Sequence, residues 1–189
     1  MKYSDRPSVN VVVHVEAAVP RVWELVSDIS LPTRFSPELQ SVAWLDGADG
    51  PVAGARFEGV NRNQMLGEWR TVSQVTEADE HRVFGWAVLS AAYLRDEAAS
   101  ATETPPARTP APEQYLSSWC FEIEAEGTGT RLQQTMRLGL GRSPLTAAIE
   151  NQPDREEEII ASRLDGLRAG MEATLDGIKA LAEADDQSA

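Results

Sequence analysis

Residues 154–183 read DREEEIIASRLDGLRAGMEATLDGIKALAE, and the rest of the predicted fold is arranged around them. Apolar residues recur there at steps of three and four: Ile160, Leu164, Leu167, Met171, Leu175, Ile178 and Leu181. This spacing predicts a long amphipathic α-helix that buries one face against a larger surface. At about 1.5 Å per residue the helix is roughly 45 Å long, enough to cross a small domain.

The predicted helix has a clear start signal and an unusual interior. Pro153 precedes it, Asp154 is a candidate N-cap, and Glu157 follows three residues later as in a capping box. Three glycines share one flank of the apolar stripe: Gly166, Gly170 and Gly177. Each costs about 1 kcal/mol relative to alanine inside a helix. We therefore expect something to approach this flank closely: a ligand cavity beside Gly170 and a packed element at Gly177.

Composition predicts one soluble globular domain over residues 1–189. Hydrophobic residues make up 42% of the chain and charged residues 25%. The net charge of −13 argues against binding to nucleic acid or to anionic membrane surfaces. No apolar run reaches the roughly 18 residues of a membrane span, so we expect no membrane insertion. Residues 1–7 lack the apolar core of a signal peptide, which favours a cytoplasmic location.

Few side chains are available for metal or redox chemistry. Cys120 is the only cysteine, which excludes an internal disulfide and a multi-cysteine zinc site. His14 and His81 are the only histidines, and both are expected at the surface. Cys120 is expected on the outer face of its strand. We therefore predict no metal and no cofactor.

Strand signals dominate the chain before the long helix. Alternation and β-favouring residues predict strands near residues 9–15, 41–45, 55–63, 68–75, 82–89, 117–124 and 131–138. Two short helices are predicted after the first strand, opening at Pro20 and over residues 28–36. Short turns rich in glycine and aspartate imply an antiparallel meander. The expected fold class is α+β, with a core over about residues 9–183 and a frayed tail at 184–189.

Residues 95–113 are the exception to this pattern. They are rich in alanine, proline, threonine and glutamate and show no period of either kind. Such a composition predicts a mobile loop. The loop is either a lid beside a pocket or a disordered insertion.

The element order resembles the helix-grip fold of the START-like or SRPBCC superfamily, in its bacterial polyketide cyclase/dehydrase-like branch. The resemblance rests on residues 22–28, 35–38, 42–47, 54–57, 129–131 and 155–181. It implies a curved seven-stranded antiparallel sheet that wraps around the long C-terminal helix. It covers nearly the whole chain, from about residue 9 to 183, but residues 95–113 depart from the family's compact pattern. The family has no universal catalytic signature, so the resemblance implies a fold and not a reaction.

Alternation along the strands predicts an inward surface of aromatic and aliphatic side chains with a few neutral polar groups. This describes a pocket for a flat or greasy small molecule, or alternatively a close-packed core. The candidate ligand-binding residues are Phe35, Phe57, Asn61, Trp69, Thr71, Ser73, Trp86, Trp119, Gln134, Gly170 and Met171. The inward polar side chains need partners, which a ligand, ordered water or neighbouring protein groups can supply. Arg34 and Glu38 are expected at one rim, as solvated surface charges or, alternatively, as groups that orient a polar end of a ligand.

Three functions compete at this stage. The leading hypothesis is the binding of a lipophilic or aromatic small molecule between the sheet and the long helix. The alternative is a polyketide aromatase/cyclase-type enzyme, as the resemblance implies, in which neutral polar groups orient the substrate. The third is a protein-interaction module. No nucleophile–base pair or phosphate loop can be recognised, and the chain is expected to be a monomer or a homodimer.

Overall fold

The computed structural model describes residues 1–64, 67–93 and 114–186. Within these residues, seven strands form one antiparallel sheet in the order β1-β7-β6-β5-β4-β3-β2. The strands are β1 (Ser8–Val15), β2 (Leu39–Trp44), β3 (Arg56–Asn63), β4 (Gly67–Asp79), β5 (Val83–Tyr93), β6 (Ser117–Glu126) and β7 (Gly129–Leu138). All seven predicted strands are confirmed. The meander from β2 to β7 returns to the first strand, because β1 pairs with β7.

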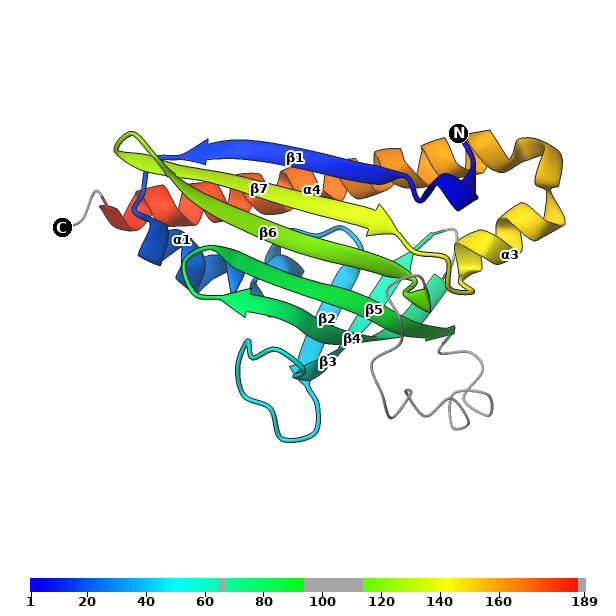
Figure 1. Cartoon of the computed structure of the whole chain (residues 1–189), viewed down its shortest axis with the longest axis horizontal. Coiled ribbons are helices and arrows are strands. Elements are labelled where there is room, and N and C mark those ends of the chain that lie inside the picture. The colour runs from blue at the N-terminus through cyan, green and yellow to red at the C-terminus, as the bar shows by residue number, and fades with distance from the viewer. Residues whose placement is uncertain (65–66, 94–113, 187–189) are drawn as a thin grey trace.

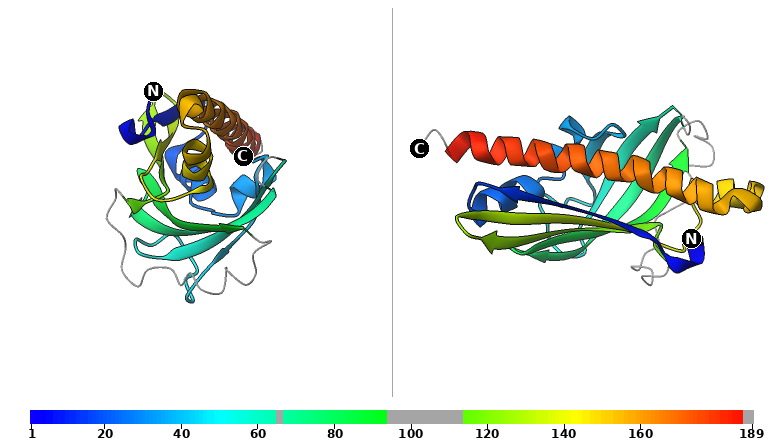
Figure 2. Two further views of the ribbon diagram at one scale, coloured as in Figure 1. Left: turned by 90° about the vertical axis from the view of Figure 1, so that its right-hand side faces the viewer. Right: turned by 90° about the horizontal axis from the view of Figure 1, so that it is seen from above.

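The sheet is curved, and the helices lie on its concave side (Figures 1 and 2). The long helix α4 (Glu156–Asp186) runs along this side next to β1. The short helix α1 (Val19–Val26) lies near the C-terminal end of α4, and α3 (Pro144–Asn151) lies near its N-terminal end. This is the predicted helix-grip arrangement.

The helix α4 is the predicted long helix, with its start displaced. Pro153–Arg155 form a 3-10 turn, η4, and α4 begins at Glu156. Asp154 therefore lies inside the turn and is not the N-cap, which corrects the sequence prediction. Three glutamates still occupy the first turn of α4, where the helix dipole favours negative charge. At the other end, residues 184–186 continue the helix.

The connecting helices are only partly as predicted. Pro20 lies in the first turn of α1, which is confirmed. The second short helix is a single 3-10 turn, η2 (Leu31–Arg34), rather than a helix over residues 28–36. The helix α3 was not predicted. Its N-cap Ser143 accepts a hydrogen bond from the Thr146 N–H at 3.3 Å.

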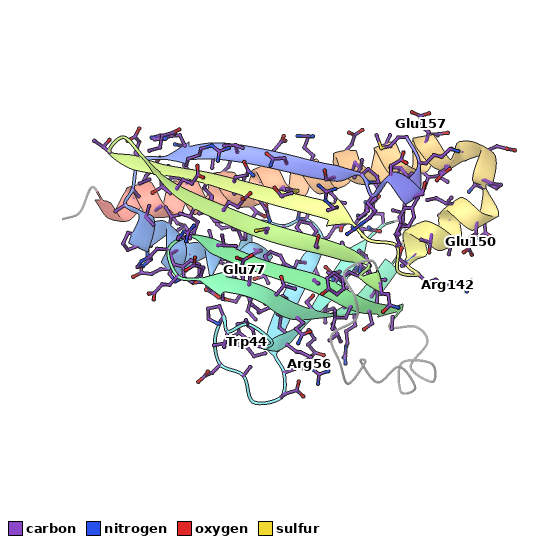
Figure 3. All side chains as sticks on the ribbon, viewed as in Figure 1. Trp44, Arg56, Glu77, Arg142, Glu150 and Glu157 are labelled. Carbon is purple, nitrogen blue, oxygen red and sulfur yellow. The ribbon has the colours of Figure 1, made fainter. Side chains whose placement is uncertain are left out.

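Arg142, just before α3, forms an ion pair of 3.3 Å with Glu150 in the last turn of α3, and Figure 3 labels both residues. Among the described residues, no helix is long and apolar enough to cross a membrane. The predicted mobile loop at residues 95–113 lies outside the described residues.

Register confirms the predicted inward face of the sheet. Inward residues stand opposite one another in the following pairs: Phe57 and Ser73, Gly59 and Thr71, Asn61 and Trp69, Phe84 and Phe121, Trp86 and Trp119, Phe121 and Gln134, and Trp119 and Met136. Because side chains on directly opposed positions share a face, these pairs line one continuous concave surface. The alternate positions, such as Glu68 and Arg70, are exposed on the convex side.

The free edge of β1 is covered by basic side chains of α4. Arg168 donates a hydrogen bond to the Asn10 carbonyl at 3.2 Å. Lys179 donates one to the His14 carbonyl at 2.6 Å. The two cations lie eleven residues apart, about three helical turns, and so share one side of α4. They satisfy backbone acceptors that an edge strand otherwise offers to another chain.

Candidate ligand-binding site

Two separate core clusters lie between the sheet and α4. The first includes α1 and the C-terminal half of α4, with Leu132 and Leu175 among its members. The second surrounds the N-terminal half of α4, with Met136 and Met171 among its members. The two clusters share no buried residue. Their boundary therefore crosses β7 between Leu132 and Met136, where Gln134 lies.

A stacked pair of tryptophans lies at this boundary on the concave face. Trp86 packs against the first cluster and Trp119 against the second. Their ring centroids are 6.0 Å apart with an interplanar angle of 1°. Both side chains face α4, yet both are only half-buried. Solvent therefore reaches this aromatic surface, whereas the neighbouring Phe84 and Phe121 are fully buried.

Further aromatic rings extend this surface across the sheet. Trp86 contacts Phe84, Phe121 and Phe57 at centroid distances of 5.5, 5.9 and 6.3 Å. Phe57 in turn meets Trp44 edge-to-face at 5.7 Å. Tilted and edge-to-face pairs of this kind stabilise the arrangement by about 0.5–1.5 kcal/mol each. The tryptophan stack is thus held by packed neighbours on the sheet.

Gln134 is the unsatisfied polar group of the site. Its residue is 5% exposed, and its Oε1 is buried with no hydrogen-bond partner among the described residues. It stands directly opposite Phe121 and one inward position from Met136, which is itself opposite Trp119. A buried carbonyl without a partner costs about 1–3 kcal/mol. A bound molecule with a hydroxyl or N–H group at this point removes that cost.

Asn61 and Thr71, two other polar residues predicted for the site, are hydrogen-bonded to protein neighbours. The Asn61 amide donates to the Gly59 carbonyl at 3.3 Å and lies 3.4 Å from the Thr71 hydroxyl. The Thr71 hydroxyl donates to the same Gly59 carbonyl at 3.3 Å. Ser73 is buried opposite Phe57. The sheet thus carries a small neutral polar group beside the aromatic surface.

The remaining predicted ligand-binding residues lie apart from one another in the structure. Phe35 packs on α4 at Gly177, and Gly170 lies beside Pro37. Met171 is 2% exposed inside the second core cluster. Trp69 is buried on β4, opposite Asn61. Their contact with a ligand stays a prediction.

An ion-pair network at the rim was missed by sequence reasoning. Arg163 on α4 donates two hydrogen bonds to the Glu38 carboxylate, at 2.7 and 3.1 Å. Asn63 at the end of β3 donates a third to Glu38 at 2.9 Å. Glu38 is therefore a paired group of the rim and not a free surface charge. Arg34, in contrast, is exposed, with its guanidinium 5.5 Å from the centre of the Phe35 ring.

The network determines the charge of Glu38. Burial raises the pKa of this carboxyl, but the hydrogen bonds and positive charge of Arg163, with the Asn63 amide, outweigh burial and lower it. Glu38 is therefore ionised at neutral pH. A sequence signal existed, since Arg163 stands seven residues before Gly170 on the glycine flank of α4.

The histidines and the cysteine lie outside the concave face. His14 is hydrogen-bonded to Glu126 and Glu16, at 2.7 and 3.1 Å, on the solvent side of β1. His81 lies in the turn between β4 and β5 with a φ of 67°. Cys120 alternates with the inward Trp119 and Phe121 on β6. Within the described part of the chain, no group of three His, Cys, Asp or Glu residues is placed to hold a metal.

Comparison with protein families gives one match, which spans nearly the whole chain. The model of the family described as "Polyketide cyclase / dehydrase and lipid transport" matches residues 6–183. The resemblance inferred from the sequence is thereby confirmed. A search of the curated proteins found no match.

Solved structures share the fold at low sequence identity. A Polyketide_cyc-like protein from Corynebacterium glutamicum is 24% identical, with a TM-score of 0.57 over 94% of this chain and 92% of that one. The Zhui aromatase/cyclase from Streptomyces sp. R1128 is 16% identical, with a TM-score of 0.60 over 94% and 93%. The di-domain ARO/CYC of the steffimycin biosynthetic pathway is 12% identical, with a TM-score of 0.66 over 98% of this chain and 55% of that one. These likenesses establish the helix-grip fold.

Proposed function

Because this chain belongs to the family described as polyketide cyclase / dehydrase and lipid transport, we propose that it binds an aromatic or lipophilic small molecule on its concave face. The observation that carries the proposal is the buried, unpartnered Oε1 of Gln134 beside the half-exposed stack of Trp86 and Trp119. An apolar aromatic surface with one unsatisfied polar atom is the usual composition of a small-molecule site. The ring of the ligand lies on the tryptophan surface, and one hydroxyl or N–H group reaches Gln134.

The proposal is tested with two ligands that differ by one hydroxyl. Naphthalene and 2-naphthol are titrated separately while tryptophan fluorescence is recorded. Both ligands quench the emission saturably, and 2-naphthol binds about tenfold more tightly, because it completes the hydrogen bonding of Gln134. A flat titration with both ligands contradicts the proposal.

Paired variants on β7 locate the polar contact. Gln134→Leu abolishes the preference for 2-naphthol and leaves naphthalene binding within about twofold. Gln133→Leu is the matched control, because Gln133 lies on the other face, hydrogen-bonded to Glu122 at 2.6 Å. If the two variants have the same effect on the preference, Gln134 does not contact the ligand.

A second candidate function is catalysis of the aromatase/cyclase type. It is favoured by the two aromatase/cyclase structures that share the fold. Incubation with a linear β-polyketone, followed by mass spectrometry, separates the two functions. An enzyme releases a dehydrated, cyclised product at a rate that Gln134→Leu changes. A binding protein returns the compound unchanged.

A further inference from the structure

Arg163 carries a positive charge at the rim of the proposed site, and its guanidinium is paired with Glu38. The two guanidinium nitrogens Nη1 and Nη2 each donate to a different oxygen of the Glu38 carboxylate, at 2.7 and 3.1 Å. This two-point geometry is the one that a guanidinium also uses for a ligand carboxylate. The side chains of Arg163 and Glu38 are only 27% and 25% exposed. Solvent therefore screens the pair less than an ordinary surface pair.

The pair is continuous with the concave face on both sides. On α4, Arg163 lies between Ile160 and Leu164, which are buried in the second core cluster. On the sheet, Asn63 donates to Glu38 at 2.9 Å and is one inward position from Asn61. A ligand that extends from the aromatic surface along β3 as far as Asn63 reaches the pair of Glu38 and Arg163.

The rest of the concave surface is electrically neutral. Among the described residues, the inward positions of the strands carry apolar side chains, amides and hydroxyls: Asn61, Asn63, Thr71, Ser73, Ser117, Thr130 and Gln134 are the polar ones. A charge moved from water onto such a surface without a partner is strongly disfavoured. The net charge of −13 adds a long-range repulsion for anions.

We infer that Glu38 is a specificity-determining residue, which occupies Arg163 and so restricts the site to uncharged ligands. The inference rests on the proposed binding function and adds the class of ligand. Neutral phenols, ketones and amides are accepted, and carboxylates of the same shape are rejected. Removing the charge of Glu38 releases Arg163 and removes the preference for the uncharged ligand.

The test uses two ligands of nearly the same shape at pH 7.5, 2-naphthamide and the anion 2-naphthoate. Wild-type protein binds 2-naphthamide at least tenfold more tightly. In Glu38→Gln the affinity for 2-naphthoate rises about tenfold, because Arg163 is free to pair with it, while the affinity for 2-naphthamide changes less than threefold. The double variant Glu38→Gln/Arg163→Gln does not show this rise in affinity for 2-naphthoate.

A control variant separates masking of Arg163 from a change in net charge, and a substitute variant is available if Glu38→Gln does not fold. Glu58→Gln removes the same charge and also breaks a pair with an arginine, the 3.4 Å contact with Arg70, but on the convex face. It leaves the preference unchanged. If Glu38→Gln does not fold, Glu38→Ser serves in its place, since it also leaves Arg163 without a carboxylate.

Each outcome has a distinct meaning. If wild-type protein binds 2-naphthamide and 2-naphthoate saturably and with the same affinity, the inference is overturned and the binding function stands. A preference that Glu38→Gln does not change also overturns the inference, because Glu38 then plays no part in the selection. If neither ligand binds to wild type, the binding function fails and the inference falls with it.

Discussion

The ring of Phe35 packs directly on the backbone of α4 at Gly177. A Cβ at Gly177 would stand 2.5 Å from three carbons of that ring. Two further contacts follow at intervals of seven residues along the same flank of α4. Pro37 lies beside Gly170, and Glu38 pairs with Arg163. Residues 35–38, the rim segment, therefore run antiparallel to α4, and the Phe35 ring accounts for the glycine at position 177.

Gly177→Ala is expected to destabilise the protein. The new methyl group forces the Phe35 ring to move, and overpacking costs about 1–3 kcal/mol. This exceeds the gain of about 1 kcal/mol from better helix propensity. The measurement is urea unfolding of the variant beside wild type.

Gly166→Ala is the matched control for this prediction. Nothing lies within 4 Å of a Cβ at Gly166, so only the helix propensity changes and stability rises by up to about 1 kcal/mol. Gly170→Ala behaves similarly, because its Cβ meets Pro37 at an ordinary 3.6 Å. Equal stabilities of Gly177→Ala and Gly166→Ala would show that Phe35 does not pack as described.

Periodic patterns predicted the fold because burial repeats along each element. The stripe from Ile160 to Ile178 fixed α4, and alternation fixed the strands and their faces. The helix α3 was missed for a physical reason: it has eight residues, and none of them is fully buried. The start of α4 was misplaced because Asp154 is a good N-cap by type, while the chain forms a 3-10 turn there.

The candidate site was predictable only where it depends on alternation. Gln134 is inward because Leu132 and Met136 are apolar and alternate with exposed positions. Its lack of a partner depends on the surroundings and has no local signal. The pairing of Glu38 with Arg163 joins residues 125 apart in sequence. The position of Arg163 on the glycine flank of α4 does not identify Glu38 as its partner, so a solvated charge was the natural expectation.

Glu38→Gln is expected to lower stability by about 1–2 kcal/mol at pH 7, between the values for exposed and buried ion pairs. Because the folded-state pKa of Glu38 is lowered, its contribution is present above the unfolded value of about 4.3. It is lost as pH falls through the folded-state pKa. Urea unfolding of both proteins from pH 7 to pH 3 therefore gives curves that converge in acid. A gap that stays constant with pH would contradict the pairing.

Cys120 is expected to react slowly with iodoacetamide in the folded protein. Burial, with the charges of Glu122 and Glu77, raises the pKa of the thiol to about 11. At pH 8.5 the thiolate is then about a hundredfold rarer than in the unfolded chain, whose thiol has a pKa near 8.5. The rate of alkylation rises as pH approaches the folded-state pKa of about 11. Glu122→Gln raises the rate of alkylation at pH 8.5. A half-maximal rate near pH 8.5 in folded protein would refute the prediction.

His14 is expected to make stability depend on pH in the opposite sense to Glu38. Its hydrogen bond to Glu126, with the charges of Glu126 and Glu16, raises the pKa of the imidazole above its ordinary value, and partial desolvation opposes this only in part. A raised folded-state pKa stabilises the protonated form. The contribution is complete below the unfolded value of about 6.5 and is lost as pH rises through the folded-state pKa.

Lys179 and Glu183 complete the surroundings of His14. Lys179 donates to the His14 carbonyl at 2.6 Å and pairs with Glu183, so its charge is compensated and the glutamates govern the imidazole. Wild type therefore exceeds His14→Gln in unfolding free energy most at pH 5.5–6, and the difference vanishes in mild alkali. NMR titration of the ring protons gives the pKa directly, and Glu126→Gln lowers it. If that pKa lies below the value in the urea-unfolded chain, Glu126 does not hold the protonated ring.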